Sequence, residues 1–154
     1  MNRRVFLLAA PGALVSLRAA AHHGWSSFDE TKPYYLAGEV VAVRWQNPHA
    51  ELELRVADAL EIPAGLAGLA VPAQRDGVDG ARILAAAAPP PRPGLWTVEL
   101  APLTRMNAWQ APEPAVGSQA AVVGFTRPGA PELRLRAEFL VAGDKVYPLR
   151  SVPA

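Results

Sequence analysis

The chain has 154 residues, which is enough for one domain and short for two. Hydrophobic residues make up 51% and charged residues 19%, a balance that excludes a disordered acidic or basic tail. A formal net charge of +1 is not that of a nucleic-acid-binding protein. The absence of cysteine excludes disulfides, zinc–thiolate sites, iron–sulfur clusters and thiol catalysis.

Residues 1–21 have the organisation of an export signal. Two arginines precede an apolar run over residues 5–17, and Ala19–Ala21 supplies the small residues that a signal peptidase requires. The run Arg3–Leu7 also resembles the twin-arginine signature, with an ordinary secretory signal as the alternative. We therefore expect a periplasmic or secreted protein. The signal removes three arginines and no acidic residue, so a mature chain of residues 22–154 has 12 basic and 14 acidic residues, a net charge of −2.

Alternating apolar and polar residues predict strands over residues 50–56, 96–100 and 133–139. A longer β-rich run predicts a strand over residues 36–45, and a more continuously apolar run predicts a fifth over residues 119–125. In the strand over residues 36–45 we expect Glu39, Val41, Val43 and Trp45 on one side, and in that over residues 133–139 we expect Phe139 on the same side as Leu135. Residues 145–149 add a short closing strand.

The connections between these strands differ in kind. Gln46–Pro48 predicts a tight reversal, because Asn before Pro favours a turn. Residues 57–94 form a Pro-, Ala- and Gly-rich segment, interpreted as a flexible surface insertion with one short helix over residues 78–88. A second helix is expected over residues 103–109. Residues 22–154 are therefore predicted to form an all-β domain, a five-stranded antiparallel OB-like barrel with short helical segments, and a small β-sandwich is the alternative.

Several motifs resemble one protein family. They are Ala21–Trp25, Phe28 with Asp29, and the segment from Gly38 to His49, which contains Trp45-Gln46-Asn47-Pro48-His49. Together they resemble DUF6152, a family of small exported bacterial proteins of unknown function. Trp96, Arg105–Trp109 and Val116-Gly117 fit its later pattern, whereas residues 57–94 depart from it. The resemblance implies export and an OB-like barrel, and it implies no activity.

The three histidines suggest a metal site. If cleavage follows Ala21, His22 becomes the first residue, and its α-amino group and imidazole Nδ1 can chelate one metal ion. A second imidazole opposite completes a three-nitrogen histidine brace, which suits copper(II). His49 is the expected second ligand, because strand parity puts it on the outward side with Glu51, and His23 is a spare candidate. These nitrogens must lose protons to bind, so the site should load near neutral pH and empty in acid.

Two alternatives remain for these histidines. Cleavage after Ala20 would make His23 the third residue and form an amino-terminal copper and nickel motif without His49. In a purely structural interpretation, the first two histidines are a solvated start of the mature chain, and His49 only fixes the hairpin. Asp29, Glu30 and Glu51 are candidates for hydrogen bonds to the metal ligands.

The resulting functional hypothesis is an exported periplasmic copper-binding protein that serves in metal carriage or homeostasis. Its alternative is an envelope interaction module without metal, which binds another envelope protein or a small ligand on the barrel surface. No catalytic motif is present, so we expect no enzyme, although a brace-type copper oxidase is not excluded. We expect no nucleic-acid partner and no membrane span in the mature chain. Trp25, Phe28, Tyr34 and Tyr35 are expected to pack against the barrel.

Overall fold

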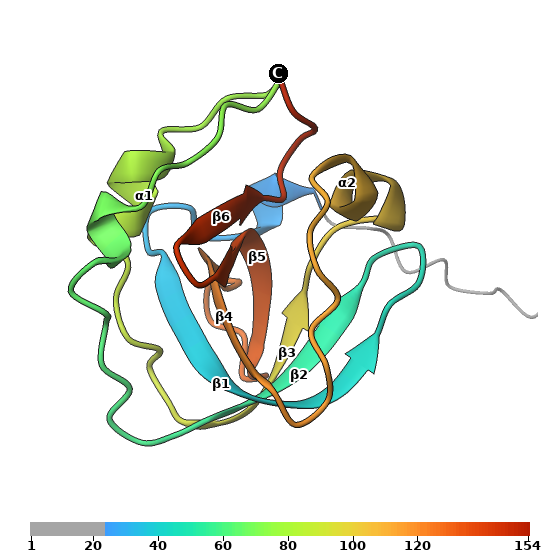
Figure 1. Cartoon of the computed structure of the whole chain (residues 1–154). Coiled ribbons are helices and arrows are strands. Elements are labelled where there is room, and N and C mark those ends of the chain that lie inside the picture. The colour runs from blue at the N-terminus through green and yellow to red at the C-terminus, as the bar shows by residue number, and fades with distance from the viewer. Residues whose placement is uncertain (1–23) are drawn as a thin grey trace, which may run out of the picture.

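The computed structural model describes residues 24–154 (Figure 1). Its strands are β1 (Tyr34–Arg44), β2 (Glu51–Val56), β3 (Gly94–Glu99), β4 (Gln119–Phe125), β5 (Arg134–Ala142) and β6 (Lys145–Pro148). The helices are α1 (Gly80–Ala86) and α2 (Leu103–Ala108), with short 3-10 turns η1 (Trp25–Ser27) and η2 (Leu66–Gly68). Every strand and both α-helices expected from the sequence are present, with ends shifted by a few residues.

The strands of the described chain form a closed barrel, and the domain is mostly β-structure. This confirms the predicted fold class. The sheet order is β3-β2-β1-β4-β5-β6, and an additional pairing of β3 with β5 closes the first five strands. All the ladders are antiparallel except this closing pair, which is parallel over Thr97–Glu99 and Arg134–Arg136. The sixth strand extends the sheet as a hairpin with β5. No helix in residues 24–154 is long and apolar enough to cross a membrane.

Two β-bulges change which side chains face the barrel interior. In β1 the register shifts between Val40 and Ala42, so that Val41 is the extra residue. The prediction of one continuous side from Glu39 to Trp45 is therefore wrong: Glu39 is exposed, while Val43 and Trp45 pack against the interior core. An extra residue reverses the alternation because side chains in a strand repeat every two residues.

The second bulge lies in β5, where Val123 pairs with Phe139 but Gly124 pairs with Ala137. Glu138 is thus the additional residue. Beyond it the parity changes, so Leu135 packs in the barrel interior while Phe139 packs in a separate cluster outside. The expectation that Phe139 shares a face with Leu135 is wrong for this reason.

The barrel interior contains a continuous hydrophobic core. The alternating apolar residues of β2 and β3 point inward as predicted, and Met106 of α2 is also fully buried there. Because Met106 packs in the core, it is not an accessible thioether ligand. The largest fully buried side chains of this core are Trp96, Leu36, Leu52, Leu54, Leu100, Met106, Leu135, Leu140 and Leu149.

A second core lies outside the barrel and corrects the interpretation of residues 57–94 as a surface insertion. Leu66, Ile83 and Leu84 of this segment are buried against outward-facing residues of β4 and β5, including Phe125 and Phe139. Figure 1 shows α1 and its flanking segments running along one side of the barrel. Asp79 caps α1 by accepting a hydrogen bond from the Arg82 amide at 3.0 Å, as expected for an N-cap aspartate. The segment is a packed part of the domain.

Side chains of α2 and of the residue after it hold the C-terminal segment. Arg105 donates a hydrogen bond to the Leu149 carbonyl at 2.8 Å, and the Trp109 indole donates one to the Ser151 carbonyl at 2.7 Å. These two side chains belong to the Arg105–Trp109 motif recognised in the sequence. They hold the residues on either side of Arg150, which follows β6, beside the barrel.

Candidate functional site

His49 lies in the turn between β1 and β2, where neighbouring residues fix the backbone. The Asn47 side chain accepts a hydrogen bond from the Leu103 amide at 3.1 Å and so caps the first turn of α2. Ala50 exchanges backbone hydrogen bonds with Leu100 and Ala101, of 2.8 and 2.9 Å. Ala50 and Leu52 are fully buried, as parity predicted, and His49 and Glu51 lie on the outer side. Within the Asn-Pro-His motif, Asn47 thus caps α2 and His49 presents its imidazole on the outer side of the barrel.

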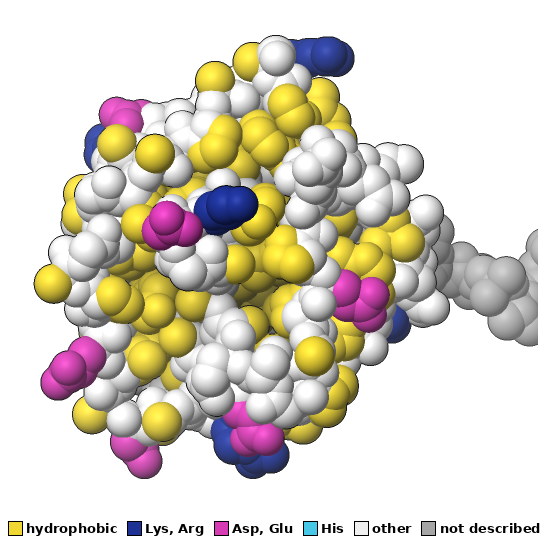
Figure 2. Space-filling model, in the orientation of Figure 1, with side chains coloured by type: hydrophobic (Ala, Val, Ile, Leu, Met, Phe, Trp, Pro, Cys, Tyr) yellow, Lys and Arg dark blue, Asp and Glu magenta, His cyan; other side chains and the backbone are white. Residues whose placement is uncertain are grey.

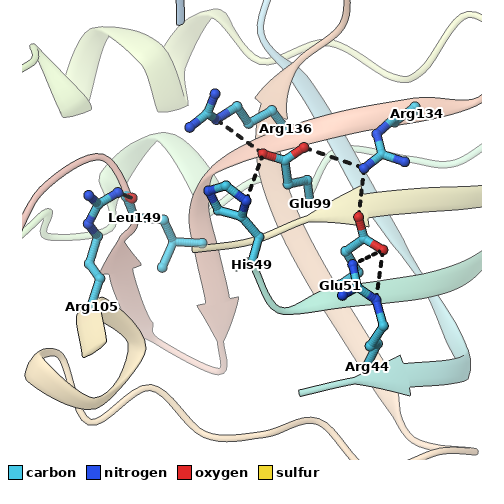
Figure 3. Close-up of polar contacts among 8 residues, drawn as sticks. All are labelled: Arg44, His49, Glu51, Glu99, Arg105, Arg134, Arg136 and Leu149. Atoms are coloured by element: carbon cyan, nitrogen blue, oxygen red, sulfur yellow. Dashed lines mark hydrogen bonds and ion pairs between the residues drawn. The ribbon is translucent and has the colours of Figure 1, made fainter. Parts of the chain in front are cut away.

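The imidazole of His49 faces a carboxylate. Its Nδ1 lies 3.8 Å from Oε1 of Glu99, at the end of β3, and both side chains are mostly buried. A carboxylate on one ring nitrogen orients a histidine and favours its other nitrogen, Nε2, as a metal ligand. Figure 3 shows this pair at the centre of a group of charged side chains.

The charged group forms a row across the seam where the barrel closes. In the ladders, Glu51 of β2 is paired with Glu99 of β3, and Glu99 is paired with Arg136 of β5. Two carboxylates directly opposite each other repel. Arg134 offsets this repulsion, because its Nη2 lies 2.6 Å from Oε1 of Glu51 and 3.4 Å from Oε2 of Glu99. Arg136 adds a contact of 3.7 Å from its Nε to Oε1 of Glu99 (Figure 3).

Glu51 is the most strongly paired carboxylate of the row. Arg44 of β1 contacts it with its Nη2 at 2.5 Å and its Nε at 3.2 Å. Partial burial raises the pKa of Glu51, but the hydrogen bonds from Arg44 and Arg134 outweigh burial and lower the pKa below its ordinary value of 4.5. Glu51 therefore stays ionised at neutral pH and pairs with Arg44 and Arg134, whereas Glu99 is the carboxylate that faces His49.

The described chain begins beside the same row. The Trp25 ring lies under the Arg136 guanidinium, with 4.4 Å between the guanidinium carbon and the ring centroid. It meets Phe125 edge-on, with centroids 6.3 Å apart, and Phe28 at the same separation. Trp25, Phe28 and Tyr35 thus pack in the cluster outside the barrel, while Tyr34 packs against the interior core. Cation–π contacts of this kind contribute about 0.5–2 kcal/mol each.

Arg136 is surrounded by other charges. Burial lowers its pKa, and the positive charges of Arg105 and Arg150 lower it further, while Glu99 acts in the opposite direction. The guanidinium therefore depends on Glu99 for compensation. His49, Glu99, Arg136 and Trp25 consequently form a continuous series of contacts from the β1–β2 turn to the start of the described chain.

A buried carboxylate fixes Arg150, a second arginine that contacts the Trp25 ring. Glu138, the bulge residue of β5, is fully buried and accepts hydrogen bonds from Arg150 at 2.7–3.1 Å. Burial raises the pKa of Glu138 despite this pairing. Arg150 also bonds Glu30 at 3.0 Å, and its guanidinium carbon lies 4.1 Å from the Trp25 ring centroid.

The predicted site residues are only partly within the described chain. His22 and His23 lie outside it, so their positions relative to His49 are not described. Among residues 24–154, no group of three or more histidine, aspartate or glutamate side chains is placed to hold a metal ion. Of the predicted supporting carboxylates, Glu51 pairs with Arg44 and Arg134, Glu30 pairs with Arg150, and Asp29 bonds Thr31 locally.

Sequence reasoning missed Glu99 and Arg136. Both lie on the outward side of strands that were predicted, so their orientation was predictable from parity. Their contact with each other was not, because it depends on the parallel closing pair of β3 and β5, which are separated in the sequence by a helix and a further strand.

A shallow cavity of about 330 Å³ lies elsewhere on the barrel. Outward residues of β1, β4 and β5 form its floor, and the loop before β4 forms one wall. The face drawn in Figure 2 is largely hydrophobic and is hollowed near its middle. The lining residues are Tyr35, Ala37, Pro112, Pro114, Ser118, Gln119, Ala120, Ala121, Leu140, Val141, Ala142 and Gly143.

Fold and site together define a small, mostly β barrel protein with a histidine–carboxylate–arginine row across its closing seam. The model of one family, described as "Family of unknown function (DUF6152)", matches residues 12–77. This match confirms the predicted resemblance over that range, which includes all three histidines. It also continues into residues 57–77, where the sequence had suggested a departure from the family, and it ends before the later motifs. No curated protein and no solved structure matches the chain.

Proposed function

We propose that this protein is an exported periplasmic copper-binding protein that serves in copper carriage or homeostasis. In this proposal the processed chain begins at His22, whose α-amino group and imidazole bind copper(II) together with Nε2 of His49. His23 is the candidate for an additional ligand. Copper(II) favours such a set of nitrogen donors in a tetragonal arrangement.

The observation that carries the proposal is the pairing of His49 with Glu99. Nδ1 of the outward imidazole lies 3.8 Å from a Glu99 oxygen, and a carboxylate beside one ring nitrogen helps to orient a histidine that binds metal through the other. The fixed backbone around His49 supports the same interpretation, since a rigid first ligand reduces the ordering cost of binding.

The reach of the chain is compatible with the proposed ligand set. His22 lies three positions before Trp25 in the chain, and an extended chain spans at most about 10 Å over that length. Trp25 contacts Arg136 at 4.4 Å, and Arg136 and His49 approach the same Glu99 oxygen at 3.7 and 3.8 Å. Only two side chains, Arg136 and Glu99, thus connect Trp25 to His49, which supports a ligand set that combines His49 with the segment before Trp25.

A titration with copper(II) tests the proposal. The protein is purified after export, and sequencing of its first residues must give His22. We expect one tight copper(II) site, and His49→Ala should weaken it by roughly tenfold or more. A variant that retains Ala21 before His22 should lose the chelate in the same way. Tight binding that His49→Ala leaves unchanged would reject His49, and a different first residue would reject the brace.

The shallow cavity favours a second candidate, the envelope interaction module without metal. Its apolar floor and volume suit a small ligand or an apolar segment of another protein. Ala121→Arg should block this surface while leaving copper(II) affinity unchanged. Loss of function in cells through Ala121→Arg, with His49→Ala fully active, would favour this candidate over copper binding.

A further inference from the structure

Two cavities adjoin on the outer face of the barrel. Beside the shallow cavity of about 330 Å³ lies a second one of about 370 Å³. Both are lined by Tyr35, Ala121, Val141 and Gly143, so they share part of one floor. The loop before β4 forms a wall of the first cavity, and the segment around η2 forms a wall of the second. We call the two cavities together the trough.

The trough follows from one row of small side chains on the outer face of the sheet. Ala37 of β1 pairs with Ala121 of β4, and Ala121 pairs with Val141 of β5. In the neighbouring row, Val123 and Phe139 are fully buried in the outer core. The first three residues are only partly buried, because the segments that cover the neighbouring row do not extend over them. The sheet therefore presents a recessed apolar floor at this place.

A tyrosine hydroxyl without a hydrogen-bond partner borders the floor. Tyr35 precedes Ala37 by two residues in β1, lies on the same outward face and is 6% exposed. Within the described chain its hydroxyl makes no hydrogen bond, and burial raises the pKa of Tyr35 above its ordinary value. Buried hydroxyl groups are normally hydrogen-bonded, since an unpaired one costs free energy. A molecule in the trough can supply the acceptor that the protein does not.

The lining indicates the charge of such a molecule. Among the described residues that line the two cavities, Asp144 is the one with a charged side chain. No lysine or arginine is present there to pair with a carboxylate or phosphate, and burial of an unpaired anion is costly. Figure 2 shows mainly hydrophobic side chains around the hollow. The lining therefore fits an uncharged molecule.

The shape of the apolar surface indicates the size of the molecule. The exposed large hydrophobic residues of the described chain are Leu95 and Val116, and neither lines the trough. The apolar surface of the trough is thus recessed between two walls, whereas a surface for another protein commonly presents large side chains as anchors. Each cavity volume lies within the range of small-molecule sites.

We propose that the trough binds an uncharged, largely apolar small molecule, and that Tyr35 donates a hydrogen bond to an oxygen acceptor of that molecule. The alanine floor supplies apolar contact, and the hydroxyl fixes the orientation of the ligand. The inference rests on the second candidate function, because it places a ligand on the same face. It is independent of copper binding, since no residue of the trough belongs to the histidine–carboxylate–arginine row.

Three naphthalenes of matched size test the chemistry of the site. Acetylnaphthalene is uncharged and carries a carbonyl acceptor, ethylnaphthalene lacks the acceptor, and naphthoate carries a negative charge. Two-dimensional NMR spectra of the isotope-labelled protein follow each titration. Acetylnaphthalene should shift the amide signals of Ala37, Ala121 and Gly143 to saturation, and naphthoate should bind roughly tenfold more weakly or not at all. The absence of a saturable shift with acetylnaphthalene, or equal binding of naphthoate, would overturn the inference.

Two substitutions in the same strand isolate the role of the hydroxyl. Tyr35→Phe should weaken acetylnaphthalene binding by roughly three- to tenfold, the loss of one neutral hydrogen bond, and should leave ethylnaphthalene binding unchanged. Tyr34→Phe is the matched control, because Tyr34 is the next residue along β1 and packs against the interior core. Equal effects of the two substitutions on acetylnaphthalene binding would show that Tyr35 is not the donor.

Ala37→Leu tests the location of the site, because a larger side chain fills the floor of the first cavity. It should abolish the binding of both uncharged naphthalenes. Unfolding temperatures of all variants show whether they remain folded. Unchanged binding in a folded Ala37→Leu protein would place the ligand elsewhere and overturn the inference.

These results are distinguishable from failure of the functions proposed above. If acetylnaphthalene does not bind while Ala121→Arg abolishes function in cells, this inference is wrong and the interaction module stands with a protein partner. If the protein binds no copper(II), the copper proposal fails and the naphthalene titrations still decide whether the trough is a ligand site.

Discussion

Glu99 determines what the His49 side chain can do. An outward histidine at the end of a turn is often only a solvated residue, but a carboxylate near Nδ1 restricts the orientation of the ring. Arg134 and Arg136 share this carboxylate, so its negative charge is compensated within the protein. At the residue scale, the candidate site is therefore an imidazole whose orientation is set by its neighbours.

We expect Glu99→Gln to weaken copper(II) binding by roughly tenfold with little change in fold, since an amide is a poorer partner for a metal-bound imidazole. Titration by calorimetry measures the effect. Glu51→Gln is the control, because Glu51 lies in the same row and contacts Arg44 and Arg134. Equal losses in the two variants would show that the effect is one of general charge and that Glu99 has no special role toward His49.

Glu51 should instead contribute to pH-dependent stability. Its pKa is lowered in the folded protein by Arg44 and Arg134, so the unfolded chain takes up a proton more readily than the folded one as the pH falls below 4.5. The stabilisation is thus present at neutral pH and is lost in acid. We expect Glu51→Gln to cost about 1 kcal/mol at pH 7, after allowance for solvent screening of the half-exposed arginines.

Denaturant unfolding of the parent and Glu51→Gln at several pH values measures this difference. The two curves should converge as the pH falls through the depressed pKa. A difference that persists unchanged into acid would mean that the glutamine disturbs packing and that the carboxylate charge is not the cause.

At the scale of elements, bulges and glycines decide how the strands meet. Gly124 of β4 lies opposite the β5 bulge, and a Cβ built there would be 2.1 Å from the Arg136 carbonyl oxygen. Such a separation is far below van der Waals contact, so the backbone of β4 or β5 must move to accept any side chain. The close approach therefore requires glycine at this position, beside the bulge that contains the buried Glu138.

Gly124→Ala should therefore destabilise the protein by about 2 kcal/mol or more, because overpacking against backbone has no flexible side chain to yield. The free energy of unfolding from denaturant titration gives the value. Gly68→Ala is the matched control, since a Cβ at Gly68 meets nothing within 4 Å. If both substitutions are equally mild, the strands are not in the close contact described.

At the scale of the whole molecule, a second layer covers one side of the barrel. Residues 57–94 cover outward apolar residues of β4 and β5, and the C-terminal segment is paired with them through the bridge between Gln74 and Pro153. A barrel this small gains stability from any additional apolar burial. The segment that sequence composition suggested was a flexible insertion is thus expected to unfold together with the barrel.

Leu84→Ala tests this expectation, because Leu84 of α1 is 1% exposed in the outer core. Truncating a buried leucine costs about 2–5 kcal/mol, so the midpoint of global unfolding should fall while the transition stays single. Leu95→Ala removes an exposed leucine and should change stability by less than about 0.5 kcal/mol. A separate early transition in Leu84→Ala would show instead that the segment is an independent layer.

Much of this architecture was readable in the order of the residues alone. Period-two alternation located the strands at residues 50–56, 96–100 and 133–139 within a few residues. The Asn47–Pro48 pair marked the reversal and parity put His49 outside, since all these signals depend on near neighbours in the chain. The resemblance to DUF6152 also came from local motifs. The alternation failed at Val41 and Glu138. One extra residue in a strand exchanges the inward and outward side chains beyond it, and nothing in the composition of the segment reveals the extra residue.

Only the tertiary structure decided which outward residues meet. The parallel closure of β3 on β5 brings Glu99 to Arg136, and the return of the C-terminal segment brings Arg150 to Trp25 across more than a hundred residues. Such contacts depend on how the sheet closes on itself, a property of the whole barrel that no local pattern encodes. The sequence alone determined the strands and the outward histidine, whereas closure of the barrel and the return of the C-terminal segment determined which carboxylates and arginines meet.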